Sequence, residues 1–526
     1  MTLPVYLDFA ASTPVASEVV EVMTAALRAP ELVGNPATSS GAGGFPQGHH
    51  AFAAIEAARL KIAALINSGP DELVFCSGAT EADNLAIIGG ARFRQADGRH
   101  VITALGEHKA VLESVRHLAA NGWRVTWLKP DPDGIIRPEA VAAALEPDTT
   151  LVSLMHANNE TGVLLDVAAI GALCRQHGAL FHVDAAQSAG RVPIDVRQQA
   201  IDLLSLSAHK IYGPKGIGAL FIDRERVRRV EPLLFGGGQE RGIRPGTLAT
   251  HQIIGMGEAF RLAAARREAD RVHVTALRDR LWSRLATLPD IIRNGHAEQT
   301  TGHILNVSIA GVEGESLHAG LQAVIPAGSG PEGPPLAVAS GSACTSQNDE
   351  PSYVLRILGR SAELARSSIR FSFGRATTTD DIDAAADRTL TVVSMLRRQS
   401  PAIGPPGWLP PPSMPDDYPG TVVLARGEAG SEALGTWVAF NAWIAADRLV
   451  RLDVQIYGCP HTREAGNQVA AGLSGRPVSA LEDFDPHEWR RALGIPVEKT
   501  GRMLIIQDAL RKCLADWDNG RLSTVL

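Results

Sequence analysis

The sequence predicts an α/β protein with a largely parallel central sheet, followed by further α+β units. Between about residues 16 and 260, short runs of β-branched and apolar residues alternate with alanine-rich stretches whose apolar residues recur at helical spacing. Strands and helices that alternate in this way form parallel sheets covered on both faces. A chain of 526 residues is also too long for one ordinary core, so two or three domains are expected.

The elements of the first domain, residues 1–260, follow one another in a regular order. Its expected strands lie in DELVFCSG, RHVITAL, RVTWLKP, TLVSLMHA, ALFHVDAA, DLLSLSAH and GALFID, and its helices include IEAARLKIAALI and VAAIGALCRQHG. The pattern then changes to a long helix, GEAFRLAAARREADRVHVTALRDRLWSRLATL, and to shorter strands and helices. Residues 261–398 are therefore expected to form a smaller α+β domain, on which the N-terminal segment is also expected to pack.

The last part of the chain predicts a linker and a third domain. Residues 399–419 are dense in proline and glycine, which excludes a helix or a central strand. In residues 420–526, WVAFNAWIAADRLVRLDVQIYGCP predicts a two-stranded hairpin, and EDFDPHEWRRALGI and IIQDALRKCLADW predict helices.

Composition and charge exclude several classes of protein. Hydrophobic residues make up 45% and charged residues 20%, which is typical of globular chains. A net charge of −7 argues against a nucleic-acid or anionic-membrane partner, and no apolar run reaches the roughly 18 residues of a transmembrane helix. The N-terminus has no basic region followed by an apolar one, so we expect no secretory signal. Five widely spaced cysteines, an odd number, favour free thiols in the cytoplasm.

Two residues at strand ends point to chemistry on a carbonyl cofactor. In SLSAHKIYGPKGIGAL, Lys210 follows an apolar strand, where desolvation favours a neutral, nucleophilic amine. In ALFHVDAAQSAG, Asp184 ends another strand, where a carboxylate can keep a pyridinium nitrogen protonated. Taken singly, Lys210 is equally well a surface lysine beside a turn, and Asp184 a helix cap.

Two further motifs add a phosphate site and a stacking ring. SGATEADNLAI is a small-residue turn in which backbone N–H groups and the Thr80 hydroxyl can hold a phosphate, although such turns often only cap helices. His108, in ALGEHKAVLES, follows another strand, where its imidazole can stack on a planar ring or simply be a satisfied polar residue. A phosphate-binding turn, a stacking histidine, a strand-end aspartate and a lysine after a strand occur here in that order. This combination is much rarer by chance than any one of the four motifs.

The chain resembles the cysteine desulfurases over about its first 395 residues. The motifs that carry the resemblance are YLDFAASTPV, GNPATSS, SGATEADN, GEHKAV, MHANNETG, HVDAAQ, SLSAHKIYGPKG, GGGQERGIRPGT, SGSACTS, EPSYVLRILG and SSIRFSFGR. The resemblance implies the fold type I of aminotransferases that depend on pyridoxal 5'-phosphate (PLP), a homodimer, and the housekeeping branch with a long catalytic loop. It implies L-cysteine as the substrate and L-alanine as the product.

The resemblance also implies a role for each motif residue. Lys210 is expected to hold PLP and to move protons at the substrate's α-carbon, while Asp184 binds the ring nitrogen and His108 stacks on the ring. The phosphate contacts it implies are Ala79, Thr80, Ser207, His209 and, from the other subunit, Thr247. The remaining implied contacts are Gln187 to the phenolic oxygen, Asn159 to the ring or substrate, and Asn35 and Arg370 to the substrate carboxylate.

A single cysteine, Cys344, stands among small residues in VASGSACTSQNDEPSYVL. Such flanks predict a loop that can move. By the resemblance, Cys344 attacks the sulfur of the bound substrate and carries it away as a persulfide, which requires the thiolate. The alternative is an inert cysteine in a serine-rich loop.

The sequence departs from the family in two places. SSGAGGFPQG is longer than the usual stretch and puts Phe45 where a histidine is expected. QAVIPAGSGPEGPPLAV inserts proline and glycine residues before the Cys344 loop. Both changes leave the identity of the partner open.

Residues 420–526 weakly resemble the scaffold proteins on which iron–sulfur clusters are assembled. The resembling stretches are VRLDVQIYGCPHT, LSGRPV, IPVEKTG and QDALRKCLADW. Of the three scaffold cysteines only Cys459 remains, and Cys459 with His461 cannot complete a tetrahedral metal site, so we expect no metal. Cys459 is a candidate second sulfur acceptor, with plain core packing as the alternative.

These observations predict a cysteine desulfurase that delivers persulfide sulfur to an acceptor protein, an iron–sulfur scaffold being one candidate. The alternatives are a selenocysteine lyase or other PLP β-lyase, and a sulfur-carrier or assembly adaptor dominated by the last domain.

Overall fold

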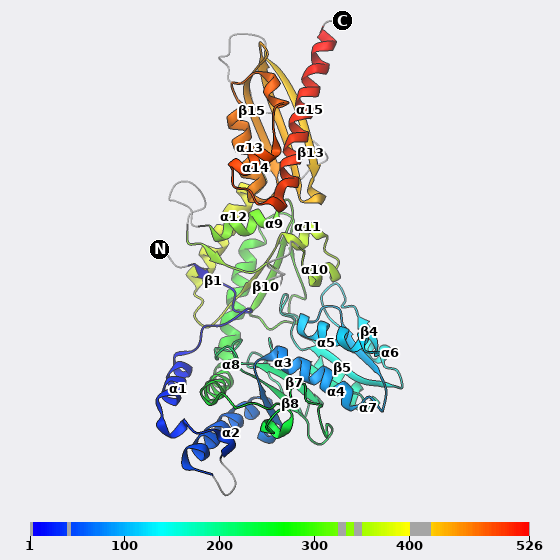
Figure 1. Cartoon of the computed structure of the whole chain (residues 1–526), viewed down its shortest axis with the longest axis vertical. Coiled ribbons are helices and arrows are strands. Elements are labelled where there is room, and N and C mark those ends of the chain that lie inside the picture. The colour runs from blue at the N-terminus through cyan, green and yellow to red at the C-terminus, as the bar shows by residue number, and fades with distance from the viewer. Residues whose placement is uncertain (1–3, 39–43, 324–332, 341–349, 400–421, 525–526) are drawn as a thin grey trace.

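The structure is a computed structural model of the chain, and it describes residues 4–38, 44–323, 333–340, 350–399 and 422–524. Three bodies of secondary structure follow one another along its longest axis (Figure 1). The large body holds the central sheet, the middle body holds the segment after it, and the C-terminal body lies at the far end.

The large body is built on a seven-stranded sheet with the order β2-β8-β7-β6-β5-β3-β4. Strands β3 to β7 pair in parallel, whereas β8 runs antiparallel to both β2 and β7. The expected α/β class with a largely parallel sheet is confirmed, with β8 as its one reversed strand. The strands are β2 (Leu73–Cys76), β3 (His100–Ala104), β4 (Arg124–Leu128), β5 (Thr149–Met155), β6 (Leu180–Asp184), β7 (Leu203–Ser207) and β8 (Gly218–Ile222).

Helices cover both faces of this sheet because successive strand residues point to opposite sides. In β2, Leu73 and Phe75 pack into one apolar cluster and Val74 and Cys76 into another. The first cluster includes α2 (Pro46–Ile66), α6 (Pro138–Ala144), α7 (Val167–His177) and α8 (Thr250–Leu285). The second includes α3 (Ala79–Asn84), the π-helical turn Leu85–Gly89, α4 (Gly90–Phe93) and α5 (Lys109–Ala120). Helix α1 (Ser17–Arg28) packs on α8.

The middle body is an antiparallel sheet, ordered β12-β10-β9, with helices against it. Its core joins the second half of α8 to α9 (Gly314–Gln322) and α12 (Thr379–Gln399). Strand β1 (Val5–Tyr6) pairs with β11 (Leu336–Ala337), so the N-terminal segment lies on this body. The other elements are β9 (Ile291–Arg293), β10 (Ile304–Ile309), α10 (Tyr353–Ile357), α11 (Ala362–Arg366) and β12 (Ser368–Ser372).

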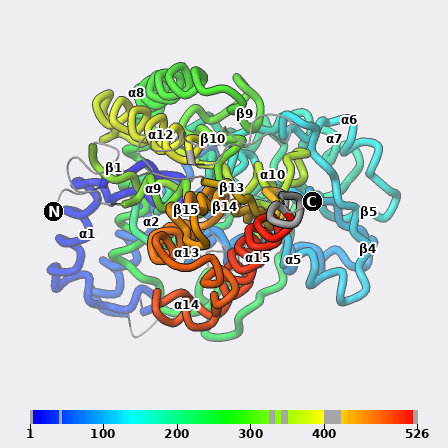
Figure 2. Tube along the Cα trace, turned by 90° about the horizontal axis from the view of Figure 1, so that it is seen from above, coloured from blue at the N-terminus to red at the C-terminus, as the bar shows by residue number. Residues whose placement is uncertain are grey.

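The C-terminal body is a three-stranded antiparallel sheet with three helices (Figure 2). The expected hairpin is present as β14 (Thr436–Ala445) and β15 (Arg448–Tyr457), but β13 (Val423–Ser431) joins it as a third strand. Helix α13 (Pro460–Leu473) follows β15, and α14 (Pro486–Ala492) and α15 (Thr500–Thr524) complete the body. Strand β13 contains Gly427, which weakens its strand pattern in the sequence. The glycine is needed because a Cβ at this position would collide with the backbone of α15.

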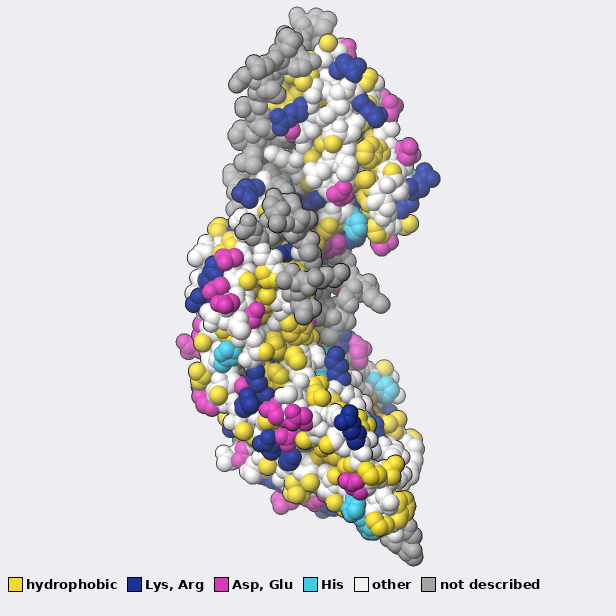
Figure 3. Space-filling view, turned by 90° about the vertical axis from the view of Figure 1, so that its left-hand side faces the viewer, with side chains coloured by type: hydrophobic (Ala, Val, Ile, Leu, Met, Phe, Trp, Pro, Cys, Tyr) yellow, Lys and Arg dark blue, Asp and Glu magenta, His cyan; other side chains and the backbone are white. Residues whose placement is uncertain are grey.

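The surface carries mixed charge. Acidic and basic side chains are interspersed on the face shown in Figure 3. Among the helices of the described segments, none combines the length and the apolar character needed to cross a membrane. The proline-rich stretch, predicted at 399–419, falls almost entirely outside the described residues.

Candidate active site

A cavity of about 590 Å³ opens beside the carboxyl ends of the parallel strands. Ligands of α/β proteins bind at this edge, because the loops that leave the strands meet there. Of the residues predicted from the sequence, the cavity is lined by Ala79, Thr80, His108, Asn159, Asp184, Gln187, Ser207, His209, Lys210 and Arg370. Segments far apart in the chain therefore converge on one space.

Lys210 lies in a tight turn that follows β7. Its Nζ donates a hydrogen bond to the backbone oxygen of Ala10, 2.5 Å away, and Arg191 holds the carbonyl of Lys210 at 2.8 Å. The amine is thus tethered at the cavity wall through a neutral acceptor, and Arg191 fixes the backbone beneath it.

Asp184 is the last residue of β6 and its side chain is buried. The backbone N–H of Ala186 donates to its Oδ1 at 2.8 Å. Burial raises the pKa of Asp184, and positive charge on His108 and Lys210 opposes that rise. A cationic ring nitrogen placed here would stabilise the carboxylate by the same electrostatic attraction.

His108 forms the N-cap of α5. Its Nδ1 accepts a hydrogen bond from the backbone N–H of Ala110 at 3.2 Å. Because Nδ1 is an acceptor, the neutral ring carries its proton on Nε2. The cap therefore fixes both the orientation of the ring and its tautomer.

One wall of the cavity holds several small and polar groups. Ala79 and Thr80 start the helical segment after β2, and Ser207 ends β7. Burial, with the nearby charges of Lys210 and Lys215, lowers the pKa of His209 to about 4, so this imidazole is neutral at pH 7. Its Nδ1 lies 3.3 Å from Ser12 Oγ.

Several buried polar atoms in this cavity have no hydrogen-bond partner among the described residues. They are Ser207 Oγ, Gln187 Oε1, Asn159 Oδ1, Arg370 Nε and both carboxylate oxygens of Asp83. An unsatisfied buried polar atom costs about 1–3 kcal/mol. A polar ligand that met these atoms would recover that free energy.

Arg370 comes from β12 in the middle body, and its side chain is only 4% exposed. It donates to the backbone oxygen of Asn159 and to Asp8 Oδ1, each at 2.8 Å. These two contacts hold the guanidinium at the mouth between the two bodies, where it can receive an anionic group.

Asp83 is a cavity residue that sequence reasoning did not single out. It is 1% exposed, and burial together with the negative charge of Asp184 raises the pKa of Asp83 well above its usual range. His182 Nε2 lies 3.6 Å from its Oδ1. The sequence offered one signal for Asp83. It lies three residues after Thr80, about one helical turn, so the two side chains are expected on the same face of the helix.

Two predicted residues do not reach the cavity within one chain. Asn35 is exposed and accepts a hydrogen bond from Ala37 N at 3.0 Å, in the turn before α2. Thr247 is exposed in the loop before α8, and its predicted contact belongs to a second subunit. Neither residue lines the cavity.

Cys344 lies outside the described residues, but the chain on both sides of its segment is anchored beside the cavity. Ala339 pairs with Arg370 through backbone hydrogen bonds of 2.8 and 3.4 Å. On the other side, Tyr353 donates to the carbonyl of Glu107, next to His108, at 2.5 Å. The four cysteines that the structure does describe are buried and free: Cys76, Cys174, Cys459 and Cys513.

Comparisons with known proteins show the family of the chain. Residues 5–385 match the aminotransferase class-V family. The cysteine desulfurase IscS of Methylococcus capsulatus is 51% identical over 401 residues, which are 76% of this chain and 95% of the relative. The same figures hold for the cysteine desulfurase IscS of Pseudomonas aeruginosa.

Solved structures give the same picture. A NifS-like protein is 31% identical, with a TM-score of 0.67, over 75% of this chain and all of its own length. A structure of SspA in complex with cysteine is 34% identical, with a TM-score of 0.60, and covers 71% of this chain and 99% of its own.

Proposed function

The chain belongs to the class-V aminotransferase family and is a PLP-dependent cysteine desulfurase, and from this premise we propose how its own residues divide the reaction. The enzyme takes sulfur from L-cysteine, releases L-alanine and keeps the sulfur as a cysteine persulfide. The observation that carries the proposed roles is the convergence of Lys210, Asp184, His108 and Arg370 on one cavity.

The described residues fit the cofactor. PLP supplies an electron sink that stabilises negative charge at the α-carbon of an amino acid. Ser207 offers a buried hydroxyl, without another partner among the described residues, that can donate to the phosphate, and Gln187 is placed beside the phenolic oxygen. Thr80 and the neutral His209 complete the phosphate wall, Asp184 holds the ring nitrogen, and His108 lies against the ring. Thr247 of a second subunit is the further phosphate contact in a homodimer.

Lys210 is the group that we assign to proton movement. Its Nζ donates a hydrogen bond to the carbonyl of Ala10 at the wall of the cavity, where it can reach a bound amino acid. Lys210 takes the proton from the α-carbon and returns one when alanine forms. Arg370 and Asn159 orient the substrate through its carboxylate, and we propose Asn35 as a further contact at that end once the dimer forms.

We assign the sulfur-accepting thiolate to Cys344, and the support is the anchoring of Ala339 and Tyr353 beside the cavity. The thiolate attacks the substrate sulfur, the carbon–sulfur bond breaks, and a sulfur–sulfur bond forms. The electron pair of the broken bond stays on the carbon side and takes up protons, which yields alanine.

We further propose that the chain comprises the three domains and the linker set out above and that it acts in the cytoplasm. We also propose that it delivers sulfur to an acceptor protein, and an iron–sulfur scaffold is the favoured class of acceptor. The resemblance of residues 420–526 to such scaffolds supports this. Cys459 is a poor direct acceptor, since its side chain is only 1% exposed.

The activity itself is tested by supplying L-cysteine, with a reductant, to the PLP-loaded protein. Alanine and sulfide are expected to form in equal amounts. Selenocysteine run in parallel separates a desulfurase from a selenocysteine lyase, and alanine formed only from selenocysteine would contradict the assignment.

Replacing Asp184 by alanine is expected to leave part of the PLP bound yet reduce kcat by about 100-fold or more, because the ring nitrogen loses its anionic partner. Steady-state alanine release and the visible absorption of bound cofactor measure the two effects separately. The matched control is Asp166→Ala, since Asp166 caps α7 and accepts from Ala169 N at 3.0 Å. If both variants behaved alike, Asp184 would be only a cap.

Arg370→Ala is expected to raise KM for L-cysteine about 10- to 100-fold, with a smaller change in kcat, because hydrogen bonds to a charged group contribute about 1.5–3 kcal/mol. The control is Arg280→Ala, which removes an arginine of α8 that pairs with Asp383 at the surface. An unchanged KM in Arg370→Ala would show that another group binds the carboxylate.

A further inference from the structure

The C-terminal body docks on the middle body through the segment between β15 and α13. Ser316 Oγ, in the first turn of α9, donates to the backbone oxygen of Gly458 at 2.7 Å. Tyr457 OH donates to the carbonyl of Val312 at 3.4 Å, and both Tyr457 and Ser316 are buried. These contacts fix the start of α13 against the start of α9.

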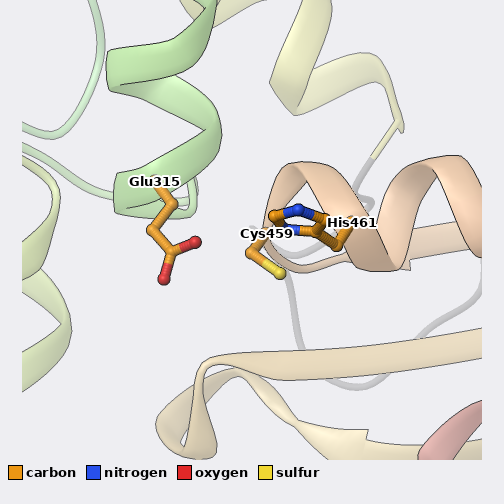
Figure 4. A group of neighbouring side chains, drawn as sticks. All are labelled: Glu315, Cys459 and His461. Carbon is orange, nitrogen blue, oxygen red and sulfur yellow. The ribbon is translucent and has the colours of Figure 1, made fainter. Parts of the chain in front are cut away.

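Three side chains of metal-ligand type meet at this contact (Figure 4). Glu315 comes from α9, whereas Cys459 and His461 come from the N-cap and the first turn of α13. One ligand atom from each of the three lies within 4.8 Å of the other two. Figure 3 shows histidine and acidic side chains at the surface where the two bodies meet.

The surroundings of each ligand favour an ion. Cys459 is 1% exposed, and Thr462 Oγ1 lies 3.3 Å from its Sγ. His461 Nδ1 is buried and has no hydrogen-bond partner among the described residues. Lys499 Nζ donates to Glu315 Oε1 at 2.6 Å and so orients the carboxylate, as hydrogen bonds to ligating carboxylates commonly do.

We propose that Glu315, Cys459 and His461 bind one Zn²⁺ that fastens the C-terminal body to the desulfurase body. A thiolate, an imidazole and a carboxylate together suit Zn²⁺ better than Mg²⁺ or Ca²⁺, which take oxygen ligands. Tetrahedral zinc places its ligand atoms about 3.5 Å apart, so a closure of about 1 Å by side-chain rotation completes the site. Binding releases the thiol proton, and water takes the fourth position.

This proposal differs from the sequence-based expectation that no metal binds. The expectation rested on Cys459 and His461 alone, two ligands that cannot hold zinc. Glu315 is remote in sequence and belongs to the other body, so nothing in the C-terminal stretch pointed to it. The site is also independent of the PLP cavity and of the proposed residue roles there.

The test uses the full-length, PLP-loaded protein, treated with a chelator, reloaded with one equivalent of zinc chloride and dialysed. Elemental analysis is expected to find one zinc per chain in the wild type, and a competing chromophoric chelator gives the affinity. Glu315→Gln, Cys459→Ser and His461→Ala are each expected to weaken zinc binding at least about 10-fold. Two control variants are expected to keep wild-type zinc binding. Cys513→Ala removes a buried thiol elsewhere in the same body, and Glu464→Gln changes an exposed residue of α13.

Lys499→Gln separates a ligand role of Glu315 from its ion pair. This variant breaks the ion pair but keeps the carboxylate, so zinc binding is expected to persist. X-ray absorption at the zinc edge of the wild type needs no variant: one sulfur at about 2.3 Å and nitrogen or oxygen ligands at about 2.0–2.1 Å are expected. Three results would overturn the proposal. They are a zinc content no higher than that of the buffer after dialysis, a zinc coordination shell without sulfur, and equal zinc affinity in all variants.

Discussion

Lys210→Ala is expected to abolish steady turnover, with a loss in kcat of about 10³-fold or more, because the variant loses both the amine that attaches the cofactor and the group that moves the α-proton. The visible absorption of the cofactor should fade in the variant on gel filtration, whereas the wild type should stay coloured. Alanine release from L-cysteine measures the loss of activity.

The control uses the second lysine of the same motif. Lys215 also lines the cavity but is exposed, and it lies beyond the turn that holds Lys210. Borohydride reduction of the wild type, followed by tryptic mass spectrometry, is expected to find the cofactor on Lys210 and not on Lys215. Cofactor found on Lys215, or a wild type that binds no PLP, would contradict the assigned site.

Cys344→Ser is expected to bind PLP and L-cysteine yet to release no alanine in a single turnover, because a hydroxyl cannot accept the sulfur as a persulfide. Binding is followed by the change in cofactor absorption on adding L-cysteine, and alanine is measured in quenched samples. Cys513→Ala removes a buried thiol of the C-terminal body and is expected to release alanine at the wild-type rate.

The order in which the thiols acquire sulfur tests the same assignment in the wild type. After one equivalent of L-cysteine, mass spectrometry of tryptic peptides is expected to find the persulfide first on Cys344. Sulfur on Cys459 is expected only later, if at all, since that thiol is buried between two bodies. A persulfide that formed first on Cys459 while Cys344 stayed unmodified would overturn the assignment.

The proposed zinc site gives the C-terminal body a structural role at its contact with the middle body. Cys459 would then be one of the ligands that hold the two bodies together. In that case removal of zinc should loosen the contact made by Tyr457 and Ser316 while the PLP cavity stays intact.

The sequence alone determined the features that depend on local pattern. Strand and helix alternation predicted the seven strands of the main sheet, since buried strands and amphipathic helices differ in the period of their apolar residues. Lys210, Asp184 and His108 were found in the same way, because each stands at the end of such a strand inside a recognisable motif. The activity was predicted from the resemblance to cysteine desulfurases that these motifs carry.

Only the tertiary structure decided what depends on contacts between distant segments. The reversed direction of β8, the pairing of β13, and the arrival of Arg370 beside Asn159 leave no local trace in the chain. Asp83 became notable only when its carboxylate was found buried near Asp184. Glu315 lies near Cys459 and His461 for the same physical reason, since the packing of whole bodies, and not sequence spacing, brings their ligand atoms within 4.8 Å of one another.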